Sequence, residues 1–411
     1  MDLSRLAPAL ARSPALARRG RLAGLSFVLR RGAEATTVAV GDAVSVKPGA
    51  APGASFTLVA APDAWASYAE ALPPVGYQSL VGMQRMGHLS VEGDVLSWGR
   101  HMLFVEQLMA AVRPPVPQPA AAAVDGPSFE PIVGRYLRFA FRGRPHRLYV
   151  EEAGQGIPLL CLHTAGSDGR QYRAVLNDPE ITKRFRVIAF DLPWHGKSSP
   201  PAGFENEAYS LDTALYVETV LAVSEALGLD RPVVMGCSIG GRAVLHLALA
   251  HGSRFRAAVG LQSATHAEAG ADTRLRDLGV LFRPDVHGQE AAAGTVACLV
   301  SPSSPQAEKW ETLWHYMQGG PAIFMGDLHY YFAEGDLRNT DLSGLDDKCP
   351  LYLLTGEYDL SATPQLTADL ARATGARHFE VMKGMGHFPM SENPEAFLGY
   401  LRPVLGRIAD D

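Results

Sequence analysis

The sequence PVVMGCSIGG, residues 232–241, indicates the fold class more strongly than any other part of the chain. The apolar run PVVM is followed by a serine between glycines and then by RAVLHLALA, a good helix former. A strand that turns sharply into a helix is the context of a nucleophile elbow, in which a strained turn exposes the serine side chain. Gly236 and Gly240 leave room where the two backbones pass close together. The sequence therefore predicts that Ser238 is a nucleophile.

Similar apolar runs of about five residues occur on both sides of this turn, separated by helical stretches. They are PLLCL (158–162), RVIAF (186–190), AAVGL (257–261), PLYLL (350–354) and HFEVM (378–382). Continuous apolar strands that alternate with helices indicate an α/β fold with a parallel sheet covered on both faces. Two more polar runs, 134–141 and 147–151, are expected to form an antiparallel hairpin at the sheet edge.

Two loop residues have the chemistry to assist Ser238. Asp359 follows the run PLYLL and His387 follows the run HFEVM. Both positions lie at the carboxyl ends of expected strands, where α/β sheets place their sites. The chain order Ser, Asp, His is the one that accompanies a nucleophile elbow. Glu357 is the alternative acid, and Asp359 is favoured because it lies further into the loop.

The loop HTAG, residues 163–166, follows the first apolar run and is expected to help hold the developing oxyanion. Two preorganised backbone N–H donors at such an oxygen lower the barrier by several kcal/mol. One donor comes from this loop, and the second is expected from Ile239, directly after the nucleophile. His163 is interpreted as a structural residue, because it lies at the strand end and turns the loop.

Together with the segment DLPWHGKS (191–198), these motifs resemble the α/β-hydrolase superfamily over residues 128–411. The resemblance implies a mostly parallel eight-stranded sheet and a serine-hydrolase mechanism. HTAG departs from the common form, HG followed by another small residue. The loop donor is therefore expected to be Ala165, with Gly166 as the alternative.

Residues 265–347 form an insert that is too long for an ordinary connection. The resemblance implies that a helical lid lies at this position. The insert is rich in aromatic residues, and Trp310, Trp314 and Tyr316 are expected to line the substrate pocket. Its histidines show no metal spacing such as HExxH, so we expect neither a metal nor a cofactor.

The segment 114–127 carries four prolines within six residues and then four alanines, which predicts a linker. Residues 1–113 before it are interpreted as a small α+β domain. A first helix is expected near the N-terminus, followed by strands near 22–30, 36–40, 43–47, 55–60 and 88–92 and by helices over 64–72 and 101–112.

Three stretches of this domain, VSVKPG (44–49), SFTLVAAPDAW (55–65) and GHLSVEGD (87–94), resemble the sterol carrier protein family. The resemblance implies a lipid ligand held between a sheet and helices. The implied lining comprises Phe27, Phe56, Trp65, Tyr77, Phe104 and Leu108. The alternative is a domain that only packs on its neighbour or supports a homodimer.

Composition narrows the classes of protein that remain. The chain has 411 residues, of which 47% are hydrophobic, and this excludes a largely disordered chain. A net charge of −6 argues against nucleic-acid binding. No run of about 18 apolar residues is present, so no membrane span is expected. Four scattered cysteines and no secretory signal favour a cytoplasmic protein.

The sequence leaves three functions open. The first is a serine hydrolase that cleaves an ester, thioester or lactone of a small apolar substrate. The second uses the same three residues to cleave a carbon–carbon bond next to a ketone, since the elbow MGCSIGG resembles that of meta-cleavage-product hydrolases as well as those of many esterases. The third is a non-enzymatic lipid carrier, which has no need of the Ser, Asp and His set.

Overall fold

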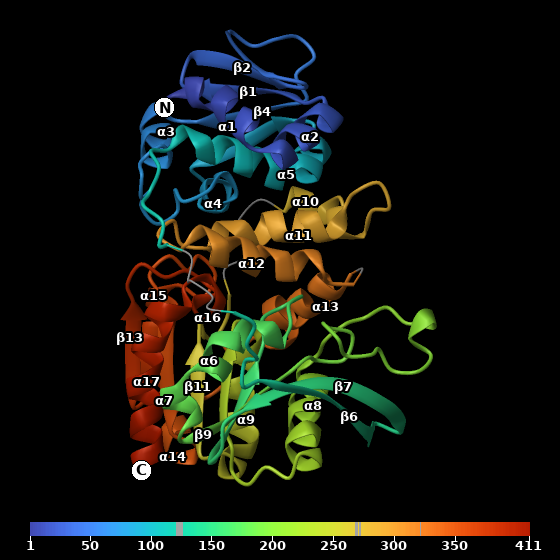
Figure 1. The fold of residues 1–411 in the computed structure, drawn as a ribbon, viewed down its shortest axis with the longest axis vertical. Helices are drawn as coiled ribbons and strands as arrows, with labels where there is room; N and C mark the ends of the chain where they lie inside the picture. Colours follow the sequence, from blue (N-terminus) through green and yellow to red (C-terminus); the bar gives the residue numbers. More distant parts are fainter. Residues whose placement is uncertain (121–125, 268–269, 271–272, 321) are drawn as a thin grey trace. The chain divides into compact units, whose positions relative to one another are not determined.

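The computed structural model describes residues 1–411 except 121–125, 268–269, 271–272 and 321. The chain divides into two compact units, coloured along the sequence in Figure 1. Unit 1 comprises Met1–Gln118 and Ala269–Ser303, and unit 2 comprises Pro119–Glu268 and Ser304–Asp411. The boundary at Gln118 falls within the predicted linker, of which residues 121–125 lie outside the described residues.

Unit 2 is built on an eight-stranded sheet in the order β13-β12-β11-β10-β8-β9-β7-β6. Neighbouring strands among β8 to β13 are all parallel, whereas β6 and β7 form an antiparallel hairpin at the edge. This confirms the predicted mostly parallel sheet. The strands are β6 Val133–Phe141, β7 Arg144–Ala153, β8 Ile157–Leu162, β9 Phe185–Phe190, β10 Val233–Cys237, β11 Ala257–Leu261, β12 Leu351–Gly356 and β13 His378–Met382.

The central strands β10, β11 and β12 are buried on both faces, which explains their continuous apolar sequence, whereas the edge hairpin β6–β7 is more polar and more exposed. In β8, Leu159 and Cys161 belong to one hydrophobic cluster, while Leu160 and Leu162 belong to another. The first cluster includes side chains of α6 and α17, and the second includes side chains of α8, α9 and α15. These helices span Arg173–Asn177 (α6), Pro394–Asp410 (α17), Thr213–Ala226 (α8), Ile239–His251 (α9) and Pro364–Thr374 (α15).

The long insert is shared between the two units. Residues 304–347 fold with unit 2 as α12 Gln306–Met317, α13 Ile323–His329, the π-helical turn Tyr330–Glu334 and α14 Leu345–Lys348. Residues 269–303 fold with unit 1 instead, where they contribute α10 Arg274–Asp277 and α11 Gly288–Val296. The lid expected over 265–347 is therefore not one structural segment, and its residues 268–269, 271–272 and 321 lie outside the described residues.

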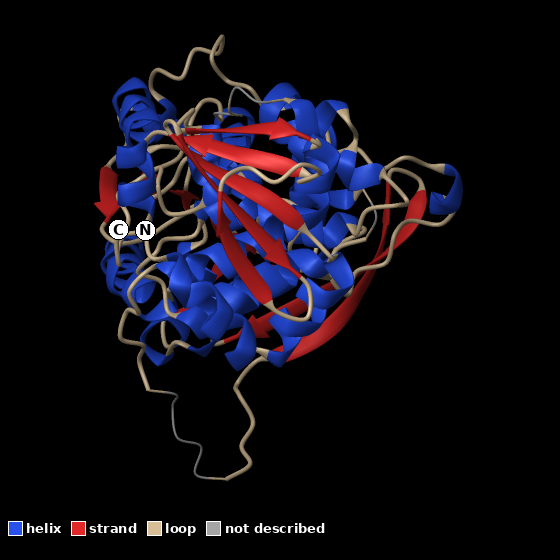
Figure 2. Ribbon diagram, turned by 90° about the horizontal axis from the view of Figure 1, so that it is seen from above, coloured by secondary structure: helices blue, strands red, loops and turns tan. Residues whose placement is uncertain are grey.

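Unit 1 contains a five-stranded sheet in the order β3-β2-β1-β4-β5, in which only β1 and β4 pair in parallel (Figure 2). The strands are β1 Ser26–Arg31, β2 Glu34–Val40, β3 Val44–Pro48, β4 Phe56–Ala60 and β5 Leu89–Gly93. Its N-terminal helices are α1 Leu6–Arg12, α2 Pro14–Ala23, α3 Pro62–Tyr68, α4 Leu80–Arg85 and α5 Val95–Met109. The small α+β region predicted from the sequence is thus present.

Small side chains allow α11 to pack closely on α5. A Cβ atom placed on Gly294 would lie 2.6 Å from Met102 Cγ, so only glycine fits at that point of α11. Val280 and Ala291 join the hydrophobic cluster of unit 1, and Gln78 Nε2 donates to Cys298 O at 2.9 Å. The second segment therefore completes the core of unit 1.

The side chains implied as a lipid-binding lining are mostly core residues. Phe27 and Phe56 stack with ring centroids 5.6 Å apart, and Trp98 meets Phe56 edge-on at the same distance. Of the six implied lining residues, all but Tyr77 are buried. Lipid binding and homodimer formation stay predictions. Within the described ranges, no helix has the length and apolarity that a membrane span requires.

Candidate active site

Ser238 occupies a strained turn between β10 and α9. Its φ of 60° lies in the left-handed region, which is uncommon for a residue with a side chain. A Cβ atom on Gly240 would lie 2.5 Å from Leu162 O, and one on Gly241 would lie 2.6 Å from Leu261 O. Glycine at these positions therefore lets α9 start close to the sheet with Ser238 at its tip.

Gly240 offers a direct test of this close packing. Gly240→Ala should lower the free energy of unfolding by about 1–3 kcal/mol, because the backbone oxygen of Leu162 cannot move aside as a side chain can. Gly399→Ala is the matched control, since Gly399 lies in α17 with no atom within 4 Å of the new methyl group. That change should stabilise the helix by up to about 1 kcal/mol. Chemical denaturation measures both, and equal effects would contradict the close packing.

His387 and Asp359 form a buried pair. The Nδ1 atom of His387 lies 2.7 Å from Asp359 Oδ2, and both residues are almost completely buried. The other carboxylate oxygen of Asp359 accepts hydrogen bonds from the N–H groups of Ser361 at 2.7 Å and Ala362 at 3.1 Å. These bonds fix the carboxylate, so the imidazole is held in one orientation with Nδ1 toward the acid.

Two contacts bring the His387 loop next to the elbow. Cys237 Sγ donates to His387 O at 3.2 Å, so the residue before Ser238 touches the histidine backbone. Gln262 Nε2 donates to Gly386 O at 2.8 Å, while its Oε1 accepts from Gly356 N at 2.8 Å. Gln262 thus ties together the ends of β11 and β12 and the histidine loop. Sequence reasoning missed Gln262, because no local pattern marks such a bridging amide.

Glu357, the alternative acid, is bound elsewhere. Its carboxylate accepts a hydrogen bond from Gly384 N at 3.0 Å and pairs with Lys383 Nζ at 3.0 Å. The hydrogen bond from Gly384, with further help from Lys383, holds the pKa of Glu357 below its ordinary value. The structure brings Asp359, and not Glu357, to His387.

The loop after β8 is held by hydrogen bonds on both sides of Ala165. Thr164 N donates to Gln171 Oε1 at 3.1 Å, and Gly166 N donates to Asp327 Oδ2 at 2.7 Å. Gly166, the alternative loop donor, is therefore already engaged by a carboxylate. Ala165 lies between these two anchored peptide groups and is buried, as is Ile239 at the start of α9.

His163 holds this loop from the strand side. Leu192 N donates to its Nε2 at 3.1 Å, and its Nδ1 lies 2.9 Å from Thr164 O. One nitrogen accepts and the other faces an acceptor, so the ring is neutral with its proton on Nδ1. Burial, together with the nearby His195, lowers the pKa of His163 to about 4. These contacts are what a structural role for His163 requires.

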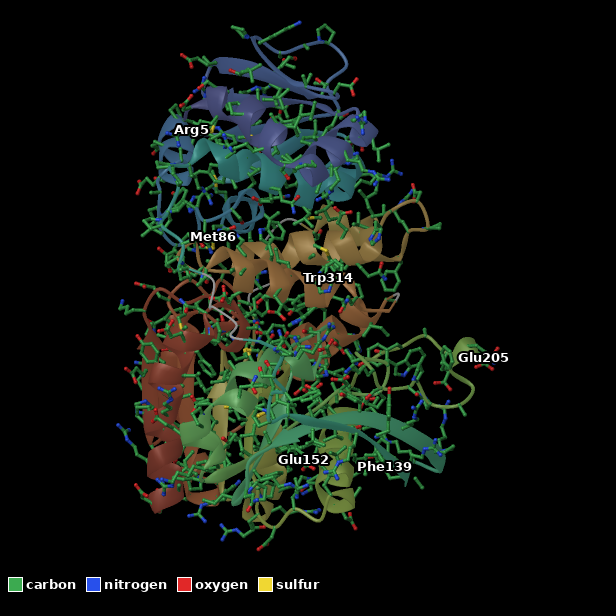
Figure 3. All side chains as sticks on the ribbon, in the orientation of Figure 1. Arg5, Met86, Phe139, Glu152, Glu205 and Trp314 are labelled. Carbon is green, nitrogen blue, oxygen red and sulfur yellow. The ribbon has the colours of Figure 1, made fainter. Side chains whose placement is uncertain are left out.

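The three expected pocket residues lie in different environments on α12. Tyr316 is buried, and its hydroxyl lies 2.6 Å from Thr164 Oγ1 on the loop after β8. Trp310 and Trp314 are 37% and 55% exposed, one helical turn apart (Trp314 is labelled in Figure 3). Tyr331, from the π-helical turn, is a further neighbour of the site. Burial raises the pKa of Tyr331 to about 12, and a hydrogen bond with the Ser238 side chain acts in the opposite direction.

In the part of the chain that the structure covers, no set of side chains that could bind a metal ion is evident. Among the described residues, no group of three or more His, Cys, Asp or Glu side chains is arranged to hold an ion.

Comparisons with known proteins identify the family of the chain. A family model described as "Alpha/beta hydrolase family" matches residues 159–399. The chain is 31% identical over 144 residues to 2-hydroxymuconate semialdehyde hydrolase of Pseudomonas sp. (strain CF600), a match that covers 34% of this chain and 47% of that protein. It thus spans about half the length of the first curated relatives. It is also 26% identical over 268 residues to pimeloyl-[acyl-carrier protein] methyl ester esterase of Vibrio vulnificus (strain YJ016), which covers 63% of this chain and 98% of that protein.

Solved structures share the fold. A thermophilic esterase from Thermogutta terrifontis aligns with a TM-score of 0.56 at 19% identity, over 68% of this chain and 99% of that chain. An enol-lactonase from Burkholderia xenovorans LB400 aligns with a TM-score of 0.53 at 20% identity, over 66% of this chain and 99% of that chain.

Proposed function

Because the chain belongs to the alpha/beta hydrolase family, we propose that it is a serine hydrolase in which Ser238, His387 and Asp359 form the catalytic triad. The observation that carries the proposal is the buried Asp359–His387 pair, 2.7 Å apart, beside a strained turn that presents Ser238. A structural ion pair alone would not require a serine in the left-handed region at the end of a parallel strand.

The proposed reaction proceeds in two steps. Ser238 Oγ attacks the acyl carbon while His387 Nε2 takes its proton, and the imidazolium then protonates the leaving alcohol, thiol or enol. Water, deprotonated by His387, attacks the acyl-enzyme and releases the acid, and the proton returns to Ser238. Asp359 holds the imidazole and stabilises its charged form. The N–H groups of Ala165 and Ile239 are the proposed oxyanion donors, since Gly166 N already donates to Asp327.

An ester, thioester or lactone with an apolar acyl or alcohol part is the proposed substrate. Hydrolysis of p-nitrophenyl esters of graded acyl length tests this proposal, with covalent labelling by a fluorophosphonate as the independent readout. A wild-type protein that neither hydrolyses any ester nor reacts with the probe would refute it.

Carbon–carbon bond hydrolysis with the same three residues is the second candidate. It is favoured by the elbow MGCSIGG and by the similarity to a semialdehyde hydrolase. In this reaction a water-derived hydroxyl becomes part of the acid, and the carbon that leaves takes a proton. Assay of a vinylogous 1,5-diketone by the loss of its dienol absorbance separates the two candidates, because an esterase leaves such a compound intact.

The exposed face of α12 is proposed to select the acyl chain as part of a lid. Trp314→Ala should change kcat/KM for long relative to short acyl chains by about 10-fold, because one lost apolar contact corresponds to about 1–3 kcal/mol. The rate at which a fluorophosphonate labels Ser238 should remain that of the wild type. Phe129→Ala, which removes a fully exposed aromatic side chain outside this helix, is the control and should leave the ratio unchanged. An equal loss for all chain lengths would assign Trp314 to the stability of the helix instead.

A further inference from the structure

Asp327 is a buried carboxylate that the proposed chemistry leaves without a role. It lies on α13 and has no measurable exposure. Its Oδ2 atom accepts from Gly166 N at 2.7 Å and lies 2.9 Å from His195 Nε2. Its Oδ1 atom accepts from the Tyr209 hydroxyl at 2.6 Å. One side chain of the insert therefore joins the loop after β8, the loop after β9 and the segment before α8.

The hydrogen bonds of His195 indicate that it is positively charged. Its Nδ1 atom lies 3.0 Å from Pro193 O, a carbonyl that can only accept, and its Nε2 atom faces the carboxylate of Asp327. Both ring nitrogens therefore donate, which requires the imidazolium form. Burial lowers the pKa of His195, but the charge and hydrogen bond of Asp327 outweigh it, so the pKa lies above its ordinary value. The pair is thus a buried carboxylate with its own counter-charge.

The contacts around Ala165 show what this pair holds in place. Gly166 has a φ of 64°, and a Cβ atom there would lie 3.0 Å from Phe324 Cβ, so α13 packs directly on the turn. Asp327 fixes the N–H that follows Ala165, while Gln171 fixes the N–H that precedes it. The N–H of Ala165 is then constrained by both neighbouring peptide planes.

We propose that Asp327, paired with His195, is a positioning residue that orients the Ala165 N–H toward the oxyanion. The inference rests on the proposed serine-hydrolase function. The same role explains why the carboxylate of Asp327 is paired with the positively charged imidazole of His195. An unpaired carboxylate so close to the oxyanion would oppose the negative charge that develops there, and the imidazolium offsets that effect.

Asp327→Ala is the first test, with Asp336→Ala as the matched control. Asp336 belongs to the same insert, and its half-buried carboxylate pairs with the guanidinium of Arg338 instead of with the loop after β8. Asp327→Ala should lower kcat by about 100-fold or more with KM nearly unchanged, as loss of one oxyanion donor does. Asp336→Ala should retain the wild-type kcat.

A transition-state analogue separates positioning from general damage. An aryl trifluoromethyl ketone forms a tetrahedral oxyanion on the serine, whereas the corresponding alcohol binds without one. Asp327→Ala should weaken inhibition by the ketone by the same factor as kcat/KM and leave inhibition by the alcohol within about twofold. Equal weakening of both inhibitors, or a wild-type kcat, would overturn the inference.

The dependence of kcat on pH gives a second readout. It is measured on Asp327→Asn, a more conservative variant that keeps the proposal testable if Asp327→Ala does not fold. The groups that face His195 are Asp327, His163, Asp191 and the ring of Tyr209. A raised pKa means that the charged form is present below that pKa and is lost as the pH rises through it. Asp327→Asn removes the carboxylate that the imidazolium offsets, so the alkaline loss of kcat that deprotonation of His195 causes in the wild type should be absent from the variant. An unchanged alkaline limb would count against the pair. An inactive wild type, by contrast, would refute the proposed function itself.

Discussion

Replacing Ser238 with alanine is expected to lower kcat at least ~1,000-fold, because members of a catalytic triad act as one unit. The fold should survive, since the side chain changes by one oxygen atom and the left-handed backbone is equally strained for both residues. Hydrolysis of p-nitrophenyl esters measures the loss, and circular dichroism confirms the fold. Labelling by a fluorophosphonate should disappear in the same variant.

Cys237 is the control for this experiment. Its thiol is buried and donates to His387 O at 3.2 Å, and burial raises its pKa well above the ordinary value. The thiolate that a nucleophile requires is therefore disfavoured. Cys237→Ala should retain labelling at Ser238. If labelling were lost in Cys237→Ala and retained in Ser238→Ala, the mechanism would be overturned.

Asp359→Asn should lower kcat on the order of 1,000–10,000-fold, because an amide can turn its N–H toward His387 and stabilise the wrong tautomer. The matched variant is Glu357→Gln, since Glu357 lies two residues earlier in the same loop and is bound to Lys383 and Gly384 N. That variant should keep kcat within about threefold, because an exposed ion pair contributes little. Steady-state kinetics of both proteins decides between the two acids, and similar losses would remove the basis for Asp359.

The sheet of unit 2 could be predicted because each of its strands is marked by a pattern of neighbouring residues in the sequence. Each strand is a short continuous apolar run, and the alternation with helices leaves few other folds. The elbow is equally local, because two glycines within five residues reflect the close approach of α9 to β10. The expected chain order Ser, Asp, His then identified Asp359 and His387 as candidate partners of Ser238.

The environment of Asp327 could not be predicted in this way. Its partners Gly166, His195 and Tyr209 are 161, 132 and 118 residues away in the sequence. No pattern in the sequence links an acid in an insert to three distant loops.

Element boundaries in unit 1 differ from expectation for local reasons. A strand is expected near 22–30, but α2 continues to Ala23 and ends at Gly24, whose φ of 54° suits glycine. A helix is expected from 101, but α5 begins at Val95 because Asp94 caps it by accepting from Ser97 N at 2.9 Å. The apolar pattern identified these elements, and short polar caps placed their ends.

Unit 1 is discontinuous in sequence, and this has a consequence for biosynthesis. Its two segments, Met1–Gln118 and Ala269–Ser303, are separated by residues that belong to unit 2. Domains commonly fold in order as they leave the ribosome. Here α5 packs on the helices and the sheet of the first 118 residues, but the face that α11 covers stays exposed until α11 has been translated. We therefore expect nascent chains that stop short of Ser303 to expose the apolar side of α5 and to depend on chaperones, even though the whole N-terminal sheet has already been made.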